Sequence, residues 1–245
     1  EVNNQTIGML FILTAWGFFL LAGLDSLVLR TQLAVPEAGV VDPRTFNQLF
    51  TTHGTAMMFL FAVPMLEALA IFMLPLLLGA RDMAFPRMSA FTYWTFLFSG
   101  LLFYGSTLPD IVNFLLPHSP LPDLVPDVGW FAYPPLSGPE YSPGLNVDFY
   151  LIGLSAAEFA GIGAAIEIIV TIFKLRAPGM ALQRIPLFAW SLLVMAFAIL
   201  FAFPAVIVSS TLLELERKLG FPFYDPQRGG NPLLWQHLFW IFGHP

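Results

Sequence analysis

Long stretches without charged residues dominate this sequence and limit the folds open to it. Residues 7–24 carry no charge and would form a helix about 27 Å long at ~1.5 Å per residue, close to the hydrocarbon thickness of a bilayer. Further apolar stretches follow, with at most two acidic residues in each: 46–80, 88–108, 149–173, 185–213 and the stretch that begins at Pro232. The pattern predicts an all-α fold, a polytopic transmembrane helix bundle with five full spans plus the start of a sixth.

The composition excludes several classes of protein. Hydrophobic residues make up 57% of the chain and charged residues only 11%, whereas soluble domains are about 25% charged. A net charge of −6 argues against a nucleic-acid partner. The chain has no cysteine, which excludes disulfides, iron–sulfur clusters and thiolate chemistry, so any metal must be held by histidine, carboxylate or thioether. We expect no cleavable signal peptide, because no basic region precedes the first apolar stretch.

The charges between the spans predict how the bundle is oriented. The loops 80–87 and 174–184 carry basic residues, whereas the segment 109–148 has five acidic residues and neither Lys nor Arg. The positive-inside rule places the two basic loops and the amino terminus on the cytoplasmic or matrix side. The acidic segment is also rich in Pro, Gly and Tyr, and we expect an ordered external cap. Without internal repeats, residues 1–245 are expected to form a single domain.

Two of the four histidines are predicted to lie inside the membrane. His53 is about seven residues, or roughly 10 Å, into the second span, and His244 is about twelve residues, or roughly 18 Å, into the sixth. An imidazole at that depth is costly unless it is bonded, and either a metal or a helix–helix hydrogen bond would serve. His237 lies nearer the surface, and His118 falls in the external segment, where we expect it to be solvated.

Several segments, in order along nearly the whole chain, resemble one family, subunit I of the haem–copper terminal oxidases of the cytochrome c oxidase type. Arg30 precedes His53 by 23 residues, the spacing expected in that family. The matching segments are THGT (52–55), DMAFPRM (82–88), WFAYPPL (130–136) and WQHLFWIFGHP (235–245). The resemblance implies that this chain is the amino-terminal portion of such a subunit.

The resemblance also implies two haems, with type a expected, and copper. His53 would be one axial ligand of the low-spin haem, since an imidazole ligand tunes the potential of the iron. His244 would be one of three histidine ligands of the copper that faces the oxygen-binding haem. Trp240, one turn before His244, would pack at that site and belongs with it to the catalytic residues.

Three more residues are assigned to cofactor binding by the resemblance. Arg30 would meet a peripheral substituent of the low-spin haem, and Trp130 would contact its propionates at the outer face. Tyr133 lies in the same motif as Trp130 and is placed with it. From the residues alone, Arg30 could equally be a helix-end residue that reaches for water, and Trp130 an ordinary interfacial anchor.

The resemblance places a proton-uptake path at the inner end, and the chain departs from the family there. Asp82 would open the path, although without the resemblance it reads as a solvated loop charge. The asparagines that continue the path in the family are replaced by Ile71 and Ser89. Glu67 lies one i, i+4 step from Ile71. We therefore predict a proton path of Asp82, Ser89 and Glu67, in which Glu67 supplies the polar group lost at Ile71.

Two further acidic residues lie in the fourth predicted span. Glu158 and Glu167 are nine residues apart, which places them on opposite faces of one helix, so they should not line one narrow cavity. Glu167 shares a face with Lys174, and a structural contact near the inner rim is one reading. Glu158 is deeper, and we expect it to be protonated or paired.

The function implied by the resemblance is a proton-pumping cytochrome c oxidase that passes electrons from cytochrome c to O₂, in a bacterial plasma membrane or a mitochondrial inner membrane. Expected partners are the rest of subunit I, other oxidase subunits including the copper-carrying one that receives electrons, and lipid. This portion alone should be inactive. A quinol oxidase or nitric oxide reductase of the same superfamily is the nearest alternative. A proton-coupled transporter is the alternative from another class.

Overall fold

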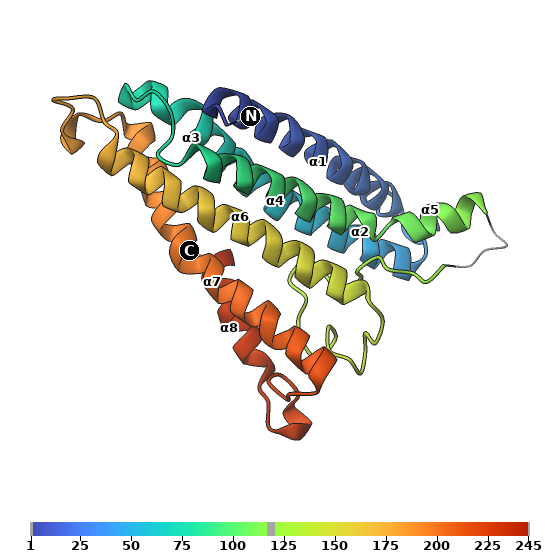
Figure 1. Cartoon of the computed structure of the whole chain (residues 1–245). Helices are drawn as coiled ribbons and strands as arrows, with labels where there is room; N and C mark the ends of the chain where they lie inside the picture. The colour runs from blue at the N-terminus through green and yellow to red at the C-terminus, as the bar shows by residue number, and fades with distance from the viewer. Residues whose placement is uncertain (1, 117–120, 245) are drawn as a thin grey trace.

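The computed structural model describes residues 2–116 and 121–244, and every regular element in this part of the chain is a helix. The long helices lie side by side, and α7 and α8 diverge from the others towards one end (Figure 1). The helices are α1 (Asn4–Gln32), α2 (Pro43–Thr55), α3 (Val63–Leu78), α4 (Pro86–Gly105), α5 (Leu108–Leu115), α6 (Asn146–Lys174), α7 (Leu187–Leu219) and α8 (Pro232–Gly243). His118 lies outside the described residues.

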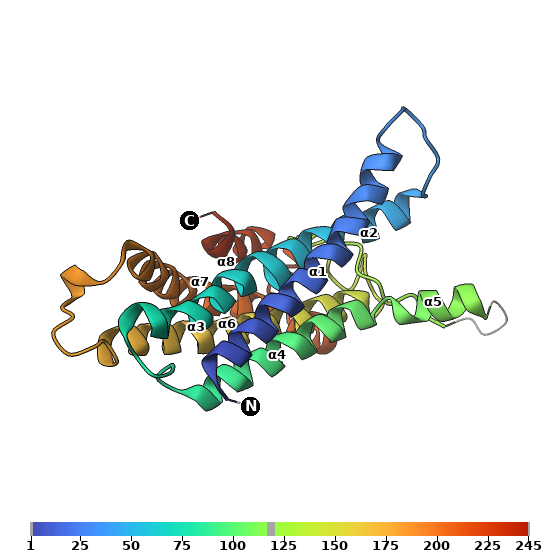
Figure 2. The ribbon, with the colours of Figure 1, turned by 90° about the horizontal axis from the view of Figure 1, so that it is seen from above.

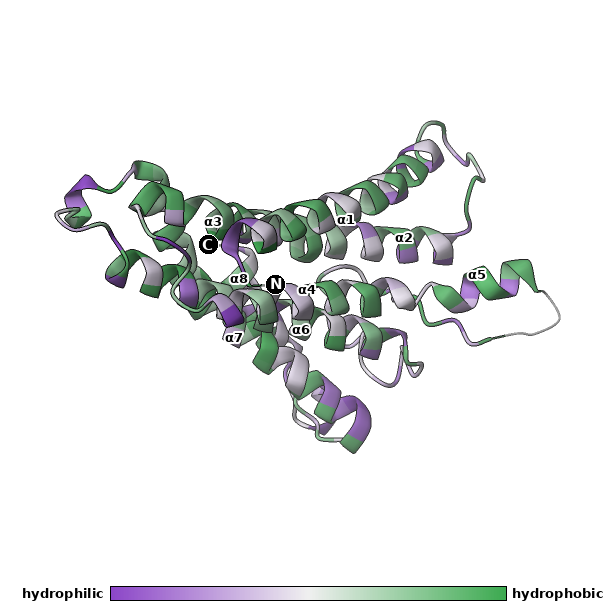
Figure 3. Ribbon diagram, turned by 45° about the horizontal axis from the view of Figure 1, so that its top comes forward, coloured by the Kyte–Doolittle hydropathy of each residue, from purple (hydrophilic) through white to green (hydrophobic). Residues whose placement is uncertain are grey.

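The helix lengths confirm the predicted fold class. Within the described residues, four helical runs are long and apolar enough to cross a membrane, namely α1, the continuous run Pro43–Leu78, α6 and α7. A fifth span results if α4 is taken together with α5, to which it is bent by 41°. Helix α8 has 12 residues and is too short to cross alone. Apolar residues cover the helices, and polar residues gather near their ends and in the connections (Figure 3). The chain therefore folds as a polytopic helical membrane bundle.

The first two spans begin earlier or end later than the apolar stretches predict. Asn3 caps α1 by accepting the backbone N–H groups of Gln5 and Thr6 at 3.0 and 3.3 Å. At its other end α1 runs on to Gln32, because polar residues such as Asp25 are tolerated inside the helix. Asp42 caps α2 in the same way, and hydrogen bonds from Thr45 lower the pKa of its carboxyl group.

A π-helical segment interrupts the long second span. It covers Ala56–Ala62 and joins α2 to α3 without a break in the chain of helical turns. Pro64 follows it at the start of α3, where a proline can neither donate a backbone hydrogen bond nor tolerate the carbonyl four residues earlier. The wider turn accommodates this. The irregularity therefore lies next to Pro64, while Pro75 lies inside α3.

The connections between the helices gather at two opposite ends of the bundle, as Figure 2 shows. We call the end with loops 79–85 and 175–186 the basic end, since it carries Arg81, Arg176 and Arg184. There the N–H of Ala177 donates to the carbonyl of Leu78 at 2.9 Å and ties the two loops together. The other end, with residues 33–42 and 121–145, is the acidic end. Helix α6 runs between the two ends and packs against both α4 and α7.

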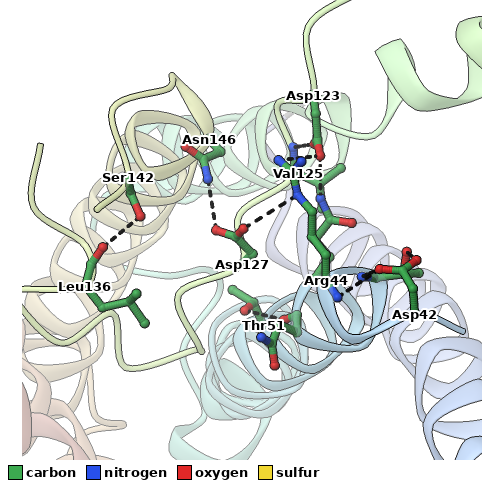
Figure 4. Close-up of polar contacts among 12 residues, drawn as sticks. Asp42, Arg44, Thr51, Asp123, Val125, Asp127, Leu136, Ser142 and Asn146 are labelled. Atoms are coloured by element: carbon green, nitrogen blue, oxygen red, sulfur yellow. Dashed lines mark hydrogen bonds and ion pairs between the residues drawn. The ribbon is translucent and has the colours of Figure 1, made fainter. Parts of the chain in front are cut away.

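Ion pairs and hydrogen bonds fix segment 121–145 on the acidic end, as Figure 4 shows. Arg44 of α2 pairs with Asp123 at 2.8 Å, and Gln48 donates to the same carboxylate at 2.8 Å. Asn146 of α6 donates to Asp127 at 3.0 Å. Residues 121–145 are therefore ordered, as predicted, and the location of this segment outside the membrane stays a prediction.

A buried arginine holds the same segment from the side of α7. The side chain of Arg217 is 2% exposed, and its Nε lies 3.0 Å from Asp148 of α6. Its other nitrogens donate to the carbonyls of Ser137, Ser142 and Gly144 at 2.7–2.8 Å. One guanidinium thus joins α6, α7 and segment 121–145, and this arrangement positions the aromatic residues of that segment.

Candidate functional site

His53 is oriented by a hydrogen bond between two helices. The imidazole is half-buried on α2, and its Nδ1 lies 2.8 Å from the carbonyl oxygen of Ala22 in α1. A carbonyl oxygen can only accept, so we assign the proton to Nδ1. Nε2 then keeps its lone pair, which is the arrangement that metal-binding histidines use. The contact with Ala22 is a helix–helix hydrogen bond of the kind expected for a buried imidazole, and it leaves Nε2 available to a metal ion.

Trp130 packs directly against the residue after His53. A Cβ atom on Gly54 would lie 2.7 Å from the indole ring, closer than real side chains approach, so only glycine fits there. The backbone beside Trp130 is fixed on both sides. The N–H of Gly129 donates to Thr51 at 2.8 Å, and the hydroxyl of Tyr150 donates to the carbonyl of Trp130 at 2.5 Å.

Helix α8 joins this aromatic group through two indole N–H groups. Trp240 donates its Nε1–H to the hydroxyl of Tyr133, and Trp235 donates its own to the carbonyl of Phe131 at 2.8 Å. The rings of Trp130 and Trp240 meet edge to face, with centroids 5.5 Å apart. The structure thus brings together Trp130, Tyr133 and Trp240, which the sequence analysis placed in two separate motifs.

Two of the predicted site residues remain apart from this group. His244 lies exposed just after α8, and its backbone N–H donates to the carbonyl of Trp240 at 3.0 Å. Arg30 is exposed near the end of α1, and the described contacts give its side chain neither a hydrogen bond nor an ion pair. Over residues 2–116 and 121–244, no three His, Asp or Glu side chains are grouped so that they could hold a metal ion. His244 alone does not make a copper site.

Two polar residues that the sequence did not point to are Asp25, which lies near His53, and Tyr104, which lies near Asp25. Asp25 lies in α1 within electrostatic range of both His53 and Tyr104 of α4. One carboxylate oxygen of Asp25 and the hydroxyl of Tyr104 are buried without a hydrogen-bond partner in the described structure. Asp25 could have been noticed, because it is the first charge after the uncharged stretch 7–24.

The predicted proton path is divided in the structure. Asp82 lies in the loop before α4, half-exposed, and accepts the N–H of Met83 at 2.8 Å. Ser89 is buried and donates to Glu167 at 2.7 Å. Glu67 is buried on α3, where its Oε1 faces Gly161 of α6 and has no hydrogen-bond partner among the described residues. Ser89 therefore contacts Glu167, not Glu67.

Glu158 and Glu167, the two glutamates in the middle and later part of α6, have different surroundings. Glu167 accepts hydrogen bonds from Ser89 and from the N–H of Phe85, and no ion pair with Lys174 is found in the described part of the chain. Glu158 is fully buried, and neither of its oxygens has a partner there. The two glutamates lie on opposite faces of α6, and both are buried because α6 is packed on both sides.

The chain resembles known proteins along almost its entire length. It is 42% identical over 243 residues to the putative cytochrome c oxidase subunit 1-beta of Streptomyces avermitilis, an alignment that covers 99% of this chain and 41% of that protein. It is 39% identical to cytochrome c oxidase subunit 1 of Corynebacterium glutamicum (99% and 39% covered) and of Bacillus subtilis (100% and 37%). The chain thus spans about two fifths of the length of these relatives.

The match to a family is as broad as the match to single proteins. The family described as cytochrome C and quinol oxidase polypeptide I matches residues 6–245, a range that includes every site residue discussed above. The helical membrane bundle agrees with that match. The chain belongs to the cytochrome c and quinol oxidase polypeptide I family.

Proposed function

We propose that this chain is the amino-terminal part of the catalytic subunit of a respiratory terminal oxidase. The whole subunit would transfer electrons from cytochrome c to O₂, reduce it to water and couple this to proton pumping. The observation that carries the proposal is the His53 imidazole, whose Nδ1 is held by the Ala22 carbonyl at 2.8 Å and whose Nε2 is left for a metal. Relatives of similar sequence bear the name cytochrome c oxidase subunit 1.

The residues around His53 would hold two haems and a copper ion in the complete subunit. His53 would bind the low-spin haem iron, with Arg30 and Trp130 at its edges. His244 would be one copper ligand, and the other ligands would come from chain beyond the 245 residues. Trp240 and Tyr133 would keep α8 in register with Trp130 through their hydrogen bond. When bound, these cofactors supply the one-electron and oxygen chemistry that side chains lack.

The proton path would begin at the basic end and run towards the centre of the membrane. Asp82 is accessible there and would collect protons, while Ser89 and Glu67 are buried and would guide them inward. The positive-inside rule supports placing this end, with the amino terminus, on the cytoplasmic or matrix side. The membrane would be a bacterial plasma membrane or a mitochondrial inner membrane.

The partners follow from the length of the chain. Since it spans about two fifths of its relatives, the rest of subunit I would complete both metal sites. A copper-carrying subunit would deliver electrons from cytochrome c at the acidic end, close to Trp130.

The test is an optical spectrum and an oxygen-consumption assay on the intact, purified oxidase complex. We expect haem bands in the wild type, and loss of the low-spin haem band together with oxygen consumption in His53→Leu. His237→Leu is the matched control, since this imidazole is exposed on α8 and should leave both unchanged. A wild-type complex without haem bands would contradict the proposal and favour a proton-coupled transporter.

A quinol oxidase is the second candidate, because the family description names quinol oxidases as well. Assays with reduced cytochrome c and with a soluble quinol as donors distinguish the two. Activity with quinol alone would replace cytochrome c in the proposal. Turnover with nitric oxide in place of O₂ would identify a nitric oxide reductase.

A further inference from the structure

Glu167 occupies a position between the basic end and the interior that the proposed path leaves empty. Its carboxyl group is fully buried in α6. Oε1 accepts two hydrogen bonds, from the hydroxyl of Ser89 at 2.7 Å and from the N–H of Phe85 at 3.1 Å. Oε2 is buried and has no partner in the described structure. One oxygen is thus held in place, and the other is free to take a proton.

Among the described residues, no cation pairs with the carboxyl group of Glu167. The ion pairs found in the described residues lie at the acidic end or between Asp225 and Arg228, and none includes Glu167. An unpaired carboxylate in the membrane region is costly, so such groups are protonated or serve proton transfer. Asp82, the accessible acid of the neighbouring loop, lies within electrostatic range of Glu167. A proton held at Asp82 therefore has a buried acid close by.

Glu67 lies too far from the loop to be the first buried acceptor. Its Oε1 faces Gly161, and Gly161 is six residues from Glu167 along α6, or about 9 Å at 1.5 Å per residue. A hydrogen bond between oxygens spans less than about 3 Å. On α3, the residue one turn from Glu67 towards the basic end is Ile71, which is fully buried and apolar. Ser89 already donates its hydroxyl hydrogen to Glu167, which directs the path along the contact of α4 with α6.

We propose that Glu167 is a proton-carrying residue between Asp82 and Glu67, and that Ser89 and the Phe85 N–H position it. The inference rests on the proposed function and adds a residue to its proton path. Oε2 takes up one proton that arrives from Asp82 through water, and the carboxylic acid later releases one proton to water on the side of Glu67. Only O–H bonds form and break, and no electron moves.

A purely structural role for Glu167 is the competing explanation. By accepting the N–H of Phe85, Glu167 also anchors the start of α4. Thr171, one turn further along α6, anchors the same loop by accepting the N–H of Ala84 at 3.0 Å. Because Thr171 cannot carry a proton at a carboxyl group, the two residues form a matched pair that separates anchoring from proton transfer.

The test uses the intact oxidase complex and three measurements. These are proton uptake during one turnover, followed with a pH-indicator dye, the carboxylic C=O band in infrared difference spectra, and the melting temperature. The amide oxygen of Glu167→Gln can still accept from Ser89 and Phe85, but the amide carries no proton. We expect uptake to slow about tenfold or more, the C=O band to disappear and the melting temperature to stay the same. In Thr171→Val we expect a lower melting temperature with unchanged uptake and an unchanged band.

Wild-type uptake and an unchanged infrared band in Glu167→Gln would overturn the inference, provided that the wild-type complex reduces O₂. If the wild-type complex shows neither haem bands nor oxygen reduction, the proposed function itself fails. Should Glu167→Gln not assemble, Glu167→Asp decides in its place. A proton carrier requires the band to shift and uptake to slow but persist, whereas an unmoved band would overturn the inference.

Discussion

The side chains that hold segment 121–145 in place are hydrogen-bonded, whereas three glutamates in the middle of the bundle each keep a buried oxygen without a partner. In the first group, Thr51, Tyr150 and Trp235 all bond the backbone of that segment at 2.5–2.8 Å. In the second group, neither oxygen of Glu158 has a partner among the described residues, and one buried oxygen of Glu67 and one of Glu167 also lack a partner there.

The difference follows from what each region would have to do. The rings around a metal ligand must keep one geometry, and the polar hydrogens of Tyr150, Trp235 and Trp240 all lie in fixed contacts. A proton path needs groups that can change their protonation and their hydrogen bonds, so some polar atoms must remain unused. We therefore expect substitutions at the acidic end to affect stability first, and substitutions of the glutamates to affect proton transfer first.

The largest loss of stability is expected for Arg217→Ala. The substitution leaves three carbonyls and Asp148 without their buried donor, and breaking a buried ion pair costs about 3–5 kcal/mol. Thermal unfolding of the intact complex and proteolysis within residues 121–145 measure the effect. Lys218→Ala is the control, since Lys218 binds the same Asp148 with a side chain that is 49% exposed and should cost less than about 1 kcal/mol. Equal losses in the two variants would contradict the fixed role of Arg217.

A smaller loss of stability is expected for Gly54→Ala. The added Cβ would meet Trp130 at 2.7 Å, and overpacking of this kind costs about 1–3 kcal/mol. Trp130 should also move, which tryptophan fluorescence and the low-spin haem band can report. Gly17→Ala is the matched control because its Cβ meets nothing within 4 Å, and helix propensity favours alanine there by up to about 1 kcal/mol. If both variants behave alike, Trp130 is not packed as tightly as the geometry indicates.

The membrane spans were predictable from local sequence. Stretches with no charge locate α1, α4 and α7, and a long apolar stretch with only two acidic residues locates α6, because burying a charge in lipid is costly wherever it occurs along a helix. Pro64 marks the π-helical segment because its ring conflicts with the preceding turn. The ends of α1 were not predictable in the same way. Asp25 lies in the helix beyond the uncharged stretch because tertiary packing gives it a partly buried place beside His53.

Contacts between helices far apart in sequence were beyond the reach of the sequence alone. The spacing of Glu158 and Glu167 predicts two faces of α6, but which helix covers each face depends on how the helices pack. Ser89 is 78 residues from Glu167, and nothing in either segment indicates their hydrogen bond. The tautomer of His53 likewise follows from Ala22, 31 residues away. The roles of these residues in catalysis stay predictions until the variants are measured.

For Glu67→Gln we expect slower proton transfer without a change in stability, because Glu67 belongs to the group of glutamates with an unpartnered oxygen. Oε1 has no hydrogen bond to lose, so the melting temperature should stay constant. Proton pumping should slow about tenfold, which corresponds to ~1.4 kcal/mol in the barrier, as measured by dye in vesicles containing the intact complex. Glu140→Gln removes an exposed carboxyl group at the acidic end and should change neither quantity. Wild-type pumping in Glu67→Gln would remove Glu67 from the path.

The smallest loss of stability is expected for Tyr133→Phe. This variant tests whether hydrogen bonds or ring packing hold α8 against segment 121–145. The substitution removes the acceptor of the Trp240 Nε1–H, and a lost hydrogen bond of this type costs about 0.5–1.5 kcal/mol. The edge-to-face contact of Trp130 with Trp240 at 5.5 Å should survive, so tryptophan fluorescence should change little. Tyr141→Phe, with a side chain 59% exposed, is the control and should be neutral. If Tyr133→Phe proves as costly as Gly54→Ala, the hydrogen bond and not the packing of the rings holds α8 against segment 121–145.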